Sequence, residues 1–177
     1  PEPALDSHPR RLAVALAAAL ALAGCQGKVT RAPCPAGQVC IEYGNNAEAA
    51  SLDPQKSNLV DEANIIADLI VGLTTDAPDG SPTPALATRW ETSPDGLVWT
   101  FHLRDAQWSD GAPVTADDFV YAYRRILDPQ TASIYAYLLY ILKNGQPLNE
   151  GKVKPQDLGV EALDPHTCLL YTSPSPR

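Results

Sequence analysis

Basic residues are scarce in this sequence and are not gathered into a patch. Thirteen lysines and arginines stand against 21 aspartates and glutamates among 177 residues, which gives a formal net charge of −8. Binding to nucleic acid needs clustered Lys and Arg side chains that neutralise phosphates. The longest basic run beyond residue 24 is the pair Arg124-Arg125. The composition therefore argues against a nucleic-acid partner.

Histidine is also scarce, and the patterns that accompany common catalytic chemistry are missing. The chain has three histidines, and it shows no Ser-His-Asp order, no glycine-rich phosphate loop and no ligand spacing for a metal. The adjacent carboxylates Asp117 and Asp118 fall in a first helical turn, where the helix dipole explains them. We expect a protein that is not an enzyme and that uses no metal or other cofactor.

No apolar run reaches the roughly 20 residues that a membrane-spanning helix needs. The longest, Leu12 to Ala23, follows Arg10-Arg11 and is typical of a secretion signal over residues 1–24 whose start is incomplete. It closes on Leu22-Ala23-Gly24-Cys25, which resembles the lipobox of bacterial lipoproteins and makes Cys25 the expected lipidation site. A buried helix is the alternative for the run, and an ordinary signal peptide is the alternative for the lipobox.

Two further cysteines lie close together after the signal. Residues 25–38 are polar and rich in Pro and Gly, and they read as a tether. Within and just after it, Cys34 and Cys40 are six positions apart, a spacing that suits a local disulfide in an exported protein. Two inert thiols are the alternative, and Cys168 has no evident partner.

The rest of the chain alternates short strands and helices. The helix at Thr115 has the clearest start, because Asp118 occupies the capping-box position three residues later. The turn Ser93-Pro94-Asp95-Gly96 predicts a hairpin between the strands on either side of it. We expect strands at 39–43, 88–92, 97–103 and 158–163, helices at 61–72, 115–127 and 135–142, and a loop at 144–157.

Several motifs in register carry a family resemblance over about residues 39 to 167. The longest are Leu86-Ala87-Thr88-Arg89-Trp90-Glu91, Trp99-Thr100-Phe101-His102-Leu103-Arg104, Trp108-Ser109-Asp110-Gly111 and Pro113-Val114-Thr115-Ala116-Asp117-Asp118-Phe119-Val120-Tyr121. Three more match in the same order: Tyr43-Gly44-Asn45-Asn46, Ser51-Leu52-Asp53-Pro54 and Asp128-Pro129-Gln130-Thr131-Ala132-Ser133. Together they closely resemble the extracellular solute-binding proteins of oligopeptide ABC transporters, which form bacterial solute-binding family 5.

The resemblance implies an α/β fold, here a truncated two-lobed periplasmic-binding-protein-like fold of type II with a mixed sheet and flanking helices. Residues 39–70 would begin the large amino-terminal lobe, and residues 71–167 would form a smaller subdomain of that lobe. Residues 168–177 depart from the family pattern and resemble translated adaptor sequence, so we expect a non-native tail from Cys168 on.

The implied function is that of a peptide-binding receptor subunit of an ABC importer. It would act as a monomer in the periplasm or on the outer face of the cell membrane, held by lipid on Cys25, with permease subunits as partners. A surface lipoprotein with an adhesive role or another solute is the alternative.

The resemblance also implies which side chains meet the ligand. Asn58, Leu59 and Val60 correspond to a segment that lies along the bound peptide, and Tyr135 corresponds to a tyrosine that faces the ligand. A solvated loop residue is the alternative for Asn58, and a core tyrosine is the alternative for Tyr135. The family members that we compare carry glutamate at the position of Asn58, so a charge-specific contact is in doubt here.

Overall fold

The structure is a computed structural model that describes residues 33–41, 44–45 and 47–174. The signal segment 1–24, Cys25 and the first part of the tether lie outside the described residues. The chain divides into two compact units, one before and one after the step from Tyr43 to Gly44, and each is described by itself.

In the first unit, Cys34 and Cys40 are joined by a disulfide with 5.8 Å between their Cα atoms. The strand expected at 39–43 is wrong in its described part, because residues 39–41 form no strand. Val39 and Ile41 are 94% and 88% exposed. A β-branched run becomes a strand only where a neighbouring strand supplies hydrogen bonds and burial, and the described residues give this run neither.

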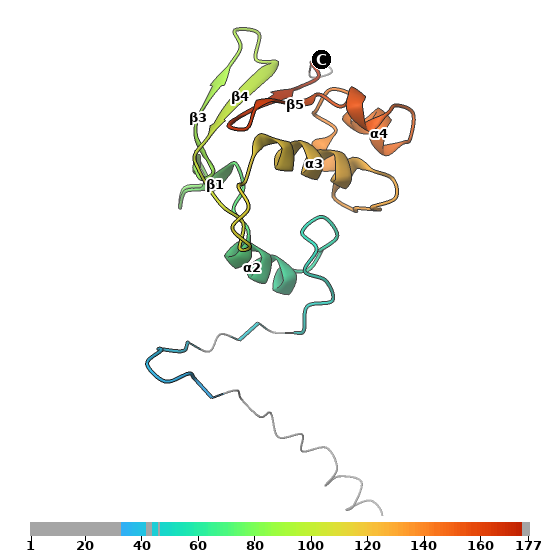
Figure 1. Cartoon of the computed structure of the whole chain (residues 1–177). Helices are drawn as coiled ribbons and strands as arrows, with labels where there is room; N and C mark the ends of the chain where they lie inside the picture. The colour runs from blue at the N-terminus through green and yellow to red at the C-terminus, as the bar shows by residue number, and fades with distance from the viewer. Residues whose placement is uncertain (1–32, 42–43, 46, 175–177) are drawn as a thin grey trace, which may run out of the picture. The chain divides into compact units, whose positions relative to one another are not determined.

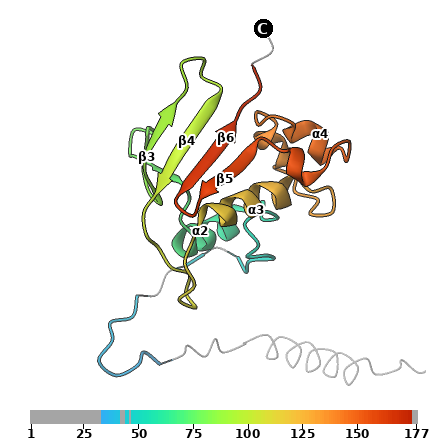
Figure 2. The same cartoon turned by 45° about the horizontal axis from the view of Figure 1, so that its top comes forward.

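The second unit is built on a four-stranded antiparallel sheet (Figure 1, Figure 2). The hairpin predicted around residues 93–96 is confirmed as β3 and β4, with Trp90 opposite Phe101 and Thr92 opposite Trp99. The strand order is β3-β4-β6-β5, so β4 and β6 are central. The strands are β3 (Ala87–Thr92), β4 (Val98–Leu103), β5 (Val160–Asp164) and β6 (Thr167–Tyr171), and a separate two-stranded sheet contains β1 (Thr74–Asp76) and β2 (Pro82–Pro84).

Helix α3 (Ala116–Leu127) lies across one face of this sheet, against β5 and β6 (Figure 2). Its predicted start is confirmed, because the Thr115 backbone N–H donates to Asp118 Oδ2 at 2.7 Å. It ends before Pro129, since the residue that precedes a proline disfavours helical backbone angles. The helix expected at 61–72 is α2 (Val60–Leu69), and Ile70 after it is already extended.

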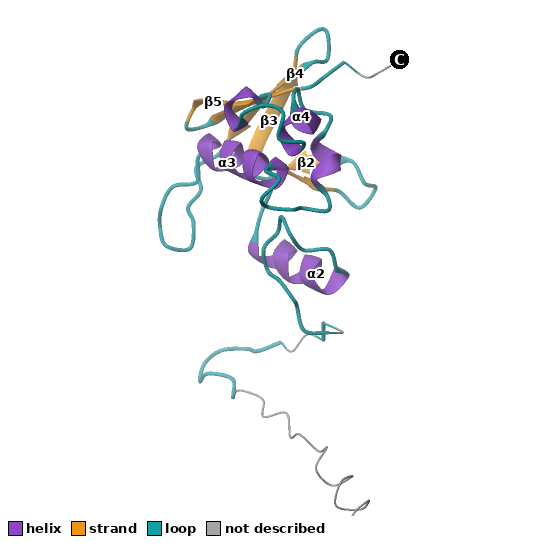
Figure 3. Cartoon of the chain, turned by 90° about the vertical axis from the view of Figure 1, so that its right-hand side faces the viewer, coloured by secondary structure: helices purple, strands orange, loops and turns teal. Residues whose placement is uncertain are grey.

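Three short helical turns follow α3, and Figure 3 labels one of them, α4. The helix expected at 135–142 is wrong: a 3-10 turn, η1 (Ala136–Leu139), stands in its place. Its apolar residues do not share one face, since Tyr137, Leu138 and Ile141 are all more than half exposed. The segment expected as a loop contains α4 (Gly145–Asn149) and the 3-10 turn η2 (Pro155–Asp157).

The core lies between α3 and the sheet and is apolar. Leu127 and Cys168 are fully buried, and Phe101 and Leu103 of β4 meet Val120 of α3 in the same cluster. Trp90 and Trp99 pack partly buried against that cluster. One face of the hairpin therefore provides the wall that the alternation along residues 97–103 predicts.

Residues 168–177 do not form a separate tail over their described part. Cys168, Leu169 and Leu170 lie in β6, which pairs with β4 on one side and β5 on the other. Burial raises the pKa of the Cys168 thiol to about 11 and so keeps it protonated. The non-native origin of this segment stays a prediction, but the sequence from Thr167 to Tyr171 completes the middle of the sheet.

The packing of the core predicts how much stability is lost when one buried side chain is truncated. Leu127→Ala removes a fully buried side chain and should lower the free energy of unfolding by about 2–5 kcal/mol, because lost burial and a residual cavity add. Urea unfolding measures this. Leu163→Ala is the matched control: Leu163 is 57% exposed, so its loss should stay within about 0.5 kcal/mol. Equal effects of both substitutions would contradict the described core.

Candidate functional site

The loop before α2 is folded around one buried carboxylate. Glu62 is 2% exposed and stands at the third position of α2. Its carboxylate accepts backbone N–H bonds from Ser51 at 2.9 Å, Asn58 at 2.9 Å and Leu59 at 3.3 Å. These donors, Asn58 first, hold the pKa of Glu62 below its usual value. The charge is therefore used inside the loop, where it fixes the backbone of Asn58 and Leu59.

A second carboxylate, that of Asp53, ties the same loop to α3. Arg125 donates from Nη2 to Asp53 Oδ2 at 2.6 Å and from Nη1 to Asp53 Oδ1 at 2.9 Å. Arg125 Nη1 also donates to Gln55 Oε1 at 2.6 Å, and Gln55 Nε2 donates to the Ala122 carbonyl at 2.9 Å. The guanidinium hydrogen bond lowers the pKa of Asp53 to about 2. Forked pairs of this kind are both stronger and more directional than single contacts.

A cavity of about 250 Å³ opens beside this loop. All four residues that the family resemblance marks as ligand-facing line it. Tyr135 reaches it from the segment after α3 and is 40% exposed. Leu59 and Val60, at the start of α2, are 49% and 72% exposed. The cavity is lined by Pro54, Ser57, Asn58, Leu59, Val60, Ala63 and Tyr135.

The lining is neutral. It contains neither a carboxylate nor a basic side chain, and its polar groups are a hydroxyl on Ser57, an amide on Asn58 and a phenol on Tyr135. Such groups can accept or donate hydrogen bonds without requiring a charge on the ligand. The site can therefore hold an uncharged part of a molecule, but it contains no nucleophile paired with a base and no group placed for acid–base chemistry.

Sequence reasoning missed three lining residues and both supporting acids. Pro54, Ser57 and Ala63 line the cavity. Pro54 ends the family motif Ser51-Leu52-Asp53-Pro54, which marked no ligand contact, and Ser57 and Ala63 belong to no motif. Glu62 had a usable signal, because an acid at the third helical position often captures backbone N–H groups. The pairing of Asp53 with Arg125 had no signal in the sequence, because 72 positions separate the two residues.

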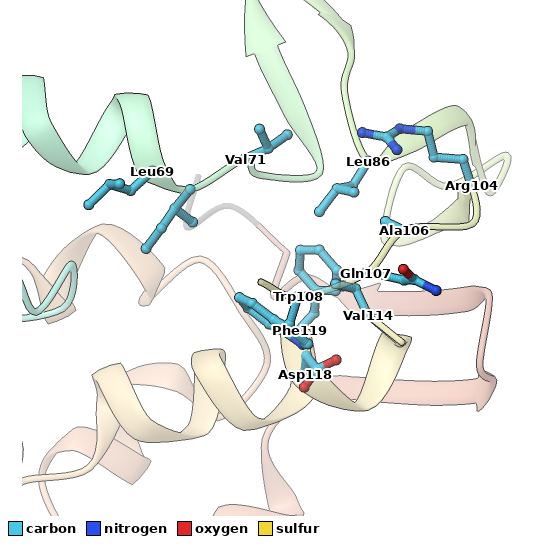
Figure 4. A pocket seen from close by; sticks show the side chains of 11 residues that line it. Leu69, Val71, Leu86, Arg104, Ala106, Gln107, Trp108, Val114, Asp118 and Phe119 are labelled. Carbon is cyan, nitrogen blue, oxygen red and sulfur yellow. The ribbon is translucent and has the colours of Figure 1, made fainter. Parts of the chain in front are cut away.

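A larger cavity, of about 320 Å³, lies between the end of α2 and α3 (Figure 4). Figure 4 shows Trp108 and Phe119 close together on its wall. Its charged groups are engaged elsewhere: Asp118 caps α3, and Arg104 Nε donates to the Ala85 carbonyl at 3.1 Å. The wall is mainly apolar, with the Gln107 amide and the Trp108 indole as its uncharged polar groups. None of the four residues that the family resemblance marks as ligand-facing lines it, so it is the weaker candidate.

The part of the chain that the structure describes contains no grouping of three or more His, Cys, Asp or Glu side chains suited to a metal. In the same residues no helix has the length and apolarity to cross a bilayer.

Comparison with known proteins decides the family. The family model for "Bacterial extracellular solute-binding proteins, family 5 Middle" matches residues 81–174. The chain belongs to this family. Family 5 proteins are solute-binding receptors, in keeping with the absence of catalytic patterns in the sequence.

Two relatives are named for oligopeptides and one for murein peptide. The chain is 48% identical over 136 residues to the periplasmic oligopeptide-binding protein OppA of Haemophilus influenzae, covering 75% of this chain and 25% of the relative. It is 51% identical over 132 residues to OppA of Escherichia coli K12, with coverages of 73% and 24%. It is 45% identical over 126 residues to the periplasmic murein peptide-binding protein MppA of Escherichia coli K12, with coverages of 70% and 23%. The chain thus spans about a quarter of the length of these relatives.

Solved structures agree with the fold. Listeria monocytogenes OppA bound to peptide matches with a TM-score of 0.70 at 40% identity, over 72% of this chain and 25% of that one. Haemophilus influenzae OppA in complex with RPPGFSPFR matches with a TM-score of 0.68 at 44% identity, with coverages of 73% and 26%. The α/β periplasmic-binding-protein-like fold expected from the sequence is confirmed.

The Asp53–Arg125 pair predicts a pH dependence of stability. The pKa of Asp53 falls from 3.8 to about 2 on folding, so its contribution is fully present above about pH 4 and is lost as the pH falls through 2. Asp53→Asn should lower the free energy of unfolding at pH 5 by about 1 kcal/mol, and the difference should shrink towards pH 2. Urea unfolding at both pH values measures it.

Asp68→Asn, at an exposed site on α2, is the matched control and should change stability by less than about 0.5 kcal/mol at either pH. A deficit of Asp53→Asn that is equally large at pH 2 and pH 5 would contradict an ionised pair.

Proposed function

We propose that the full-length protein to which this chain belongs is the peptide-binding receptor subunit of an ABC importer. The observation that carries the proposal is the joint position of Asn58, Leu59, Val60 and Tyr135 in one cavity, on a loop whose shape Glu62 and Arg125 fix. Relatives of the same fold are described as bound to peptide or in complex with a peptide. In this function the cavity would take one portion of an extended peptide.

The neutral lining suits a receptor that accepts many sequences. Contacts to a peptide's main chain resemble added strand pairing and do not read the side chains. A cavity with amide and hydroxyl groups can also keep water, which bridges polar groups without making binding weak. Both features let one site hold different peptides.

Location and partners form part of the same proposal. A secreted receptor lipidated on Cys25 would stay at the membrane beside its permease subunits, because two or more acyl chains make anchoring stable. Labelling of cells with a palmitate analogue tests this, and a Cys25→Ser variant that still takes up label would count against Cys25 as the lipidated residue.

The decisive experiment uses the mature full-length protein, produced without lipid. Mass spectrometry of what copurifies, followed by calorimetry with a mixed tripeptide to pentapeptide library, should find peptides of mixed sequence and narrow length. A protein that ignores peptides but is stabilised by a metal, a sugar or a host surface component would move the function to another solute or to the adhesive alternative.

The uncharged side chain of Asn58 leads to a second prediction, which concerns the preference for charged peptides. Asn58→Glu adds a carboxylate to the neutral cavity and should favour peptides with lysine at the contacting position by about 0.5–1 kcal/mol, a few-fold in affinity. Calorimetry with Ala-Lys-Ala and Ala-Gln-Ala measures the preference, which should weaken at high salt because exposed charges are screened.

Asn58→Gln lengthens the side chain without adding charge and is the matched control; it should leave the lysine preference unchanged. An equal change in both variants would show that size, not charge, acts at this position.

A further inference from the structure

We propose that four side chains, Asp53, Gln55, Glu62 and Arg125, act as a polar clasp that holds the ligand-facing loop in its binding shape before any ligand arrives. The inference deepens the proposed function and rests on it. It makes Glu62 and Arg125 positioning residues, which act on the ligand only through the loop.

The first argument is that apolar packing does not hold this loop. Among the described residues from 47 to 72, Glu62 alone is buried. Leu52 and Leu59, the large apolar side chains nearest the loop's two ends, are 50% and 49% exposed. A segment with little apolar burial is ordered only if other contacts oppose its conformational entropy. The polar clasp provides those contacts.

The second argument is the direction of the clasp's hydrogen bonds. Asp53 and Gln55 flank the lining residue Pro54, and both meet Arg125. The Asp53 carbonyl accepts the N–H groups of Lys56 and Ser57 at 3.0 Å, which closes the turn between them. Hydrogen bonds of the loop itself and of its flanking side chains therefore fix the backbone that forms the cavity wall from residue 54 to residue 58.

The third argument is that the clasp joins the two sides of the cavity. Glu62 binds the N–H groups of the ligand-facing residues Asn58 and Leu59. Arg125 belongs to the last turn of α3, and the chain runs from there to Tyr135 on the other side. The pair Asp53–Arg125 thus connects the loop on one side of the cavity with the helix that precedes Tyr135, and its side chains are 25% and 32% exposed.

Loss of the clasp should change the rate of peptide binding more than it changes the contacts in the bound complex. If only a fraction of molecules holds the binding shape, the apparent affinity falls by that fraction. Losing the clasp should therefore slow peptide association, while dissociation from the completed complex stays nearly the same.

The test compares Arg125→Met with Arg89→Met in the mature full-length protein. Arg89 also pairs with an acid, Glu91, at 3.8 Å, but it lies on β3 and is 58% exposed. Stopped-flow fluorescence with tri-alanine should show association about tenfold slower for Arg125→Met, with dissociation changed less than twofold. Arg89→Met should alter neither rate. Arg125→Lys should recover only part of the loss, because an ammonium cannot form the fork.

Hydrogen exchange gives the second readout and needs no ligand. Backbone amides of residues 51–59 should exchange faster in Arg125→Met than in the unsubstituted protein, while those of β4 should not. Asp53→Asn keeps the side-chain shape and should reproduce both results if Arg125→Met folds poorly. Unchanged association and unchanged loop exchange would overturn the inference. An unsubstituted protein that binds no peptide would instead overturn the proposed function, and loop exchange would still decide the clasp.

Discussion

The forked ion pair between Asp53 and Arg125 joins two segments that lie 72 positions apart in the sequence. Its two hydrogen bonds, at 2.9 and 2.6 Å, attach the loop before α2 to the last turn of α3. Elsewhere the unit is held by an apolar core between α3 and the sheet. The loop has no such core and depends on ionic hydrogen bonds. Water and acid weaken these bonds more readily than they weaken the apolar packing around Leu127. The attachment of this loop should therefore weaken as the pH falls through the pKa of Asp53, about 2.

Elements whose signals lie within a few residues were predictable from the sequence. The hairpin of β3 and β4 follows from a turn sequence between two alternating runs, and α3 follows from Thr115 and Asp118. The family resemblance added Asn58, Leu59, Val60 and Tyr135, which the structure gathers in one cavity. Local periodicity alone would have found none of these four.

The remaining features depend on partners far away in the sequence. The run at 39–43 has strand-forming residues, but its described part, 39–41, has no adjacent strand among the described residues. The run at 135–142 has apolar residues without one apolar face. In contrast, β6 has a neighbour on each side and is central, although the sequence analysis expected a non-native tail from Cys168 on. Backbone pairing tolerates any apolar, β-compatible sequence there. The Asp53–Arg125 pair has no local signal at all.

The placement of charged side chains explains how a polar loop can form a site that does not select ligands by charge. Asp53, Glu62 and Arg125 do not line the cavity. Asp53 and Arg125 pair with each other, and the Glu62 carboxylate is stabilised by backbone N–H groups. The wall itself carries only neutral groups. If those charges faced the cavity, every ligand would have to match them, since an unmatched and partly desolvated charge is costly. Because the charged groups form hydrogen bonds that hold the loop, the site can be rigid without selecting for ligand charge. Rigidity and breadth of recognition are compatible here because different residues provide them.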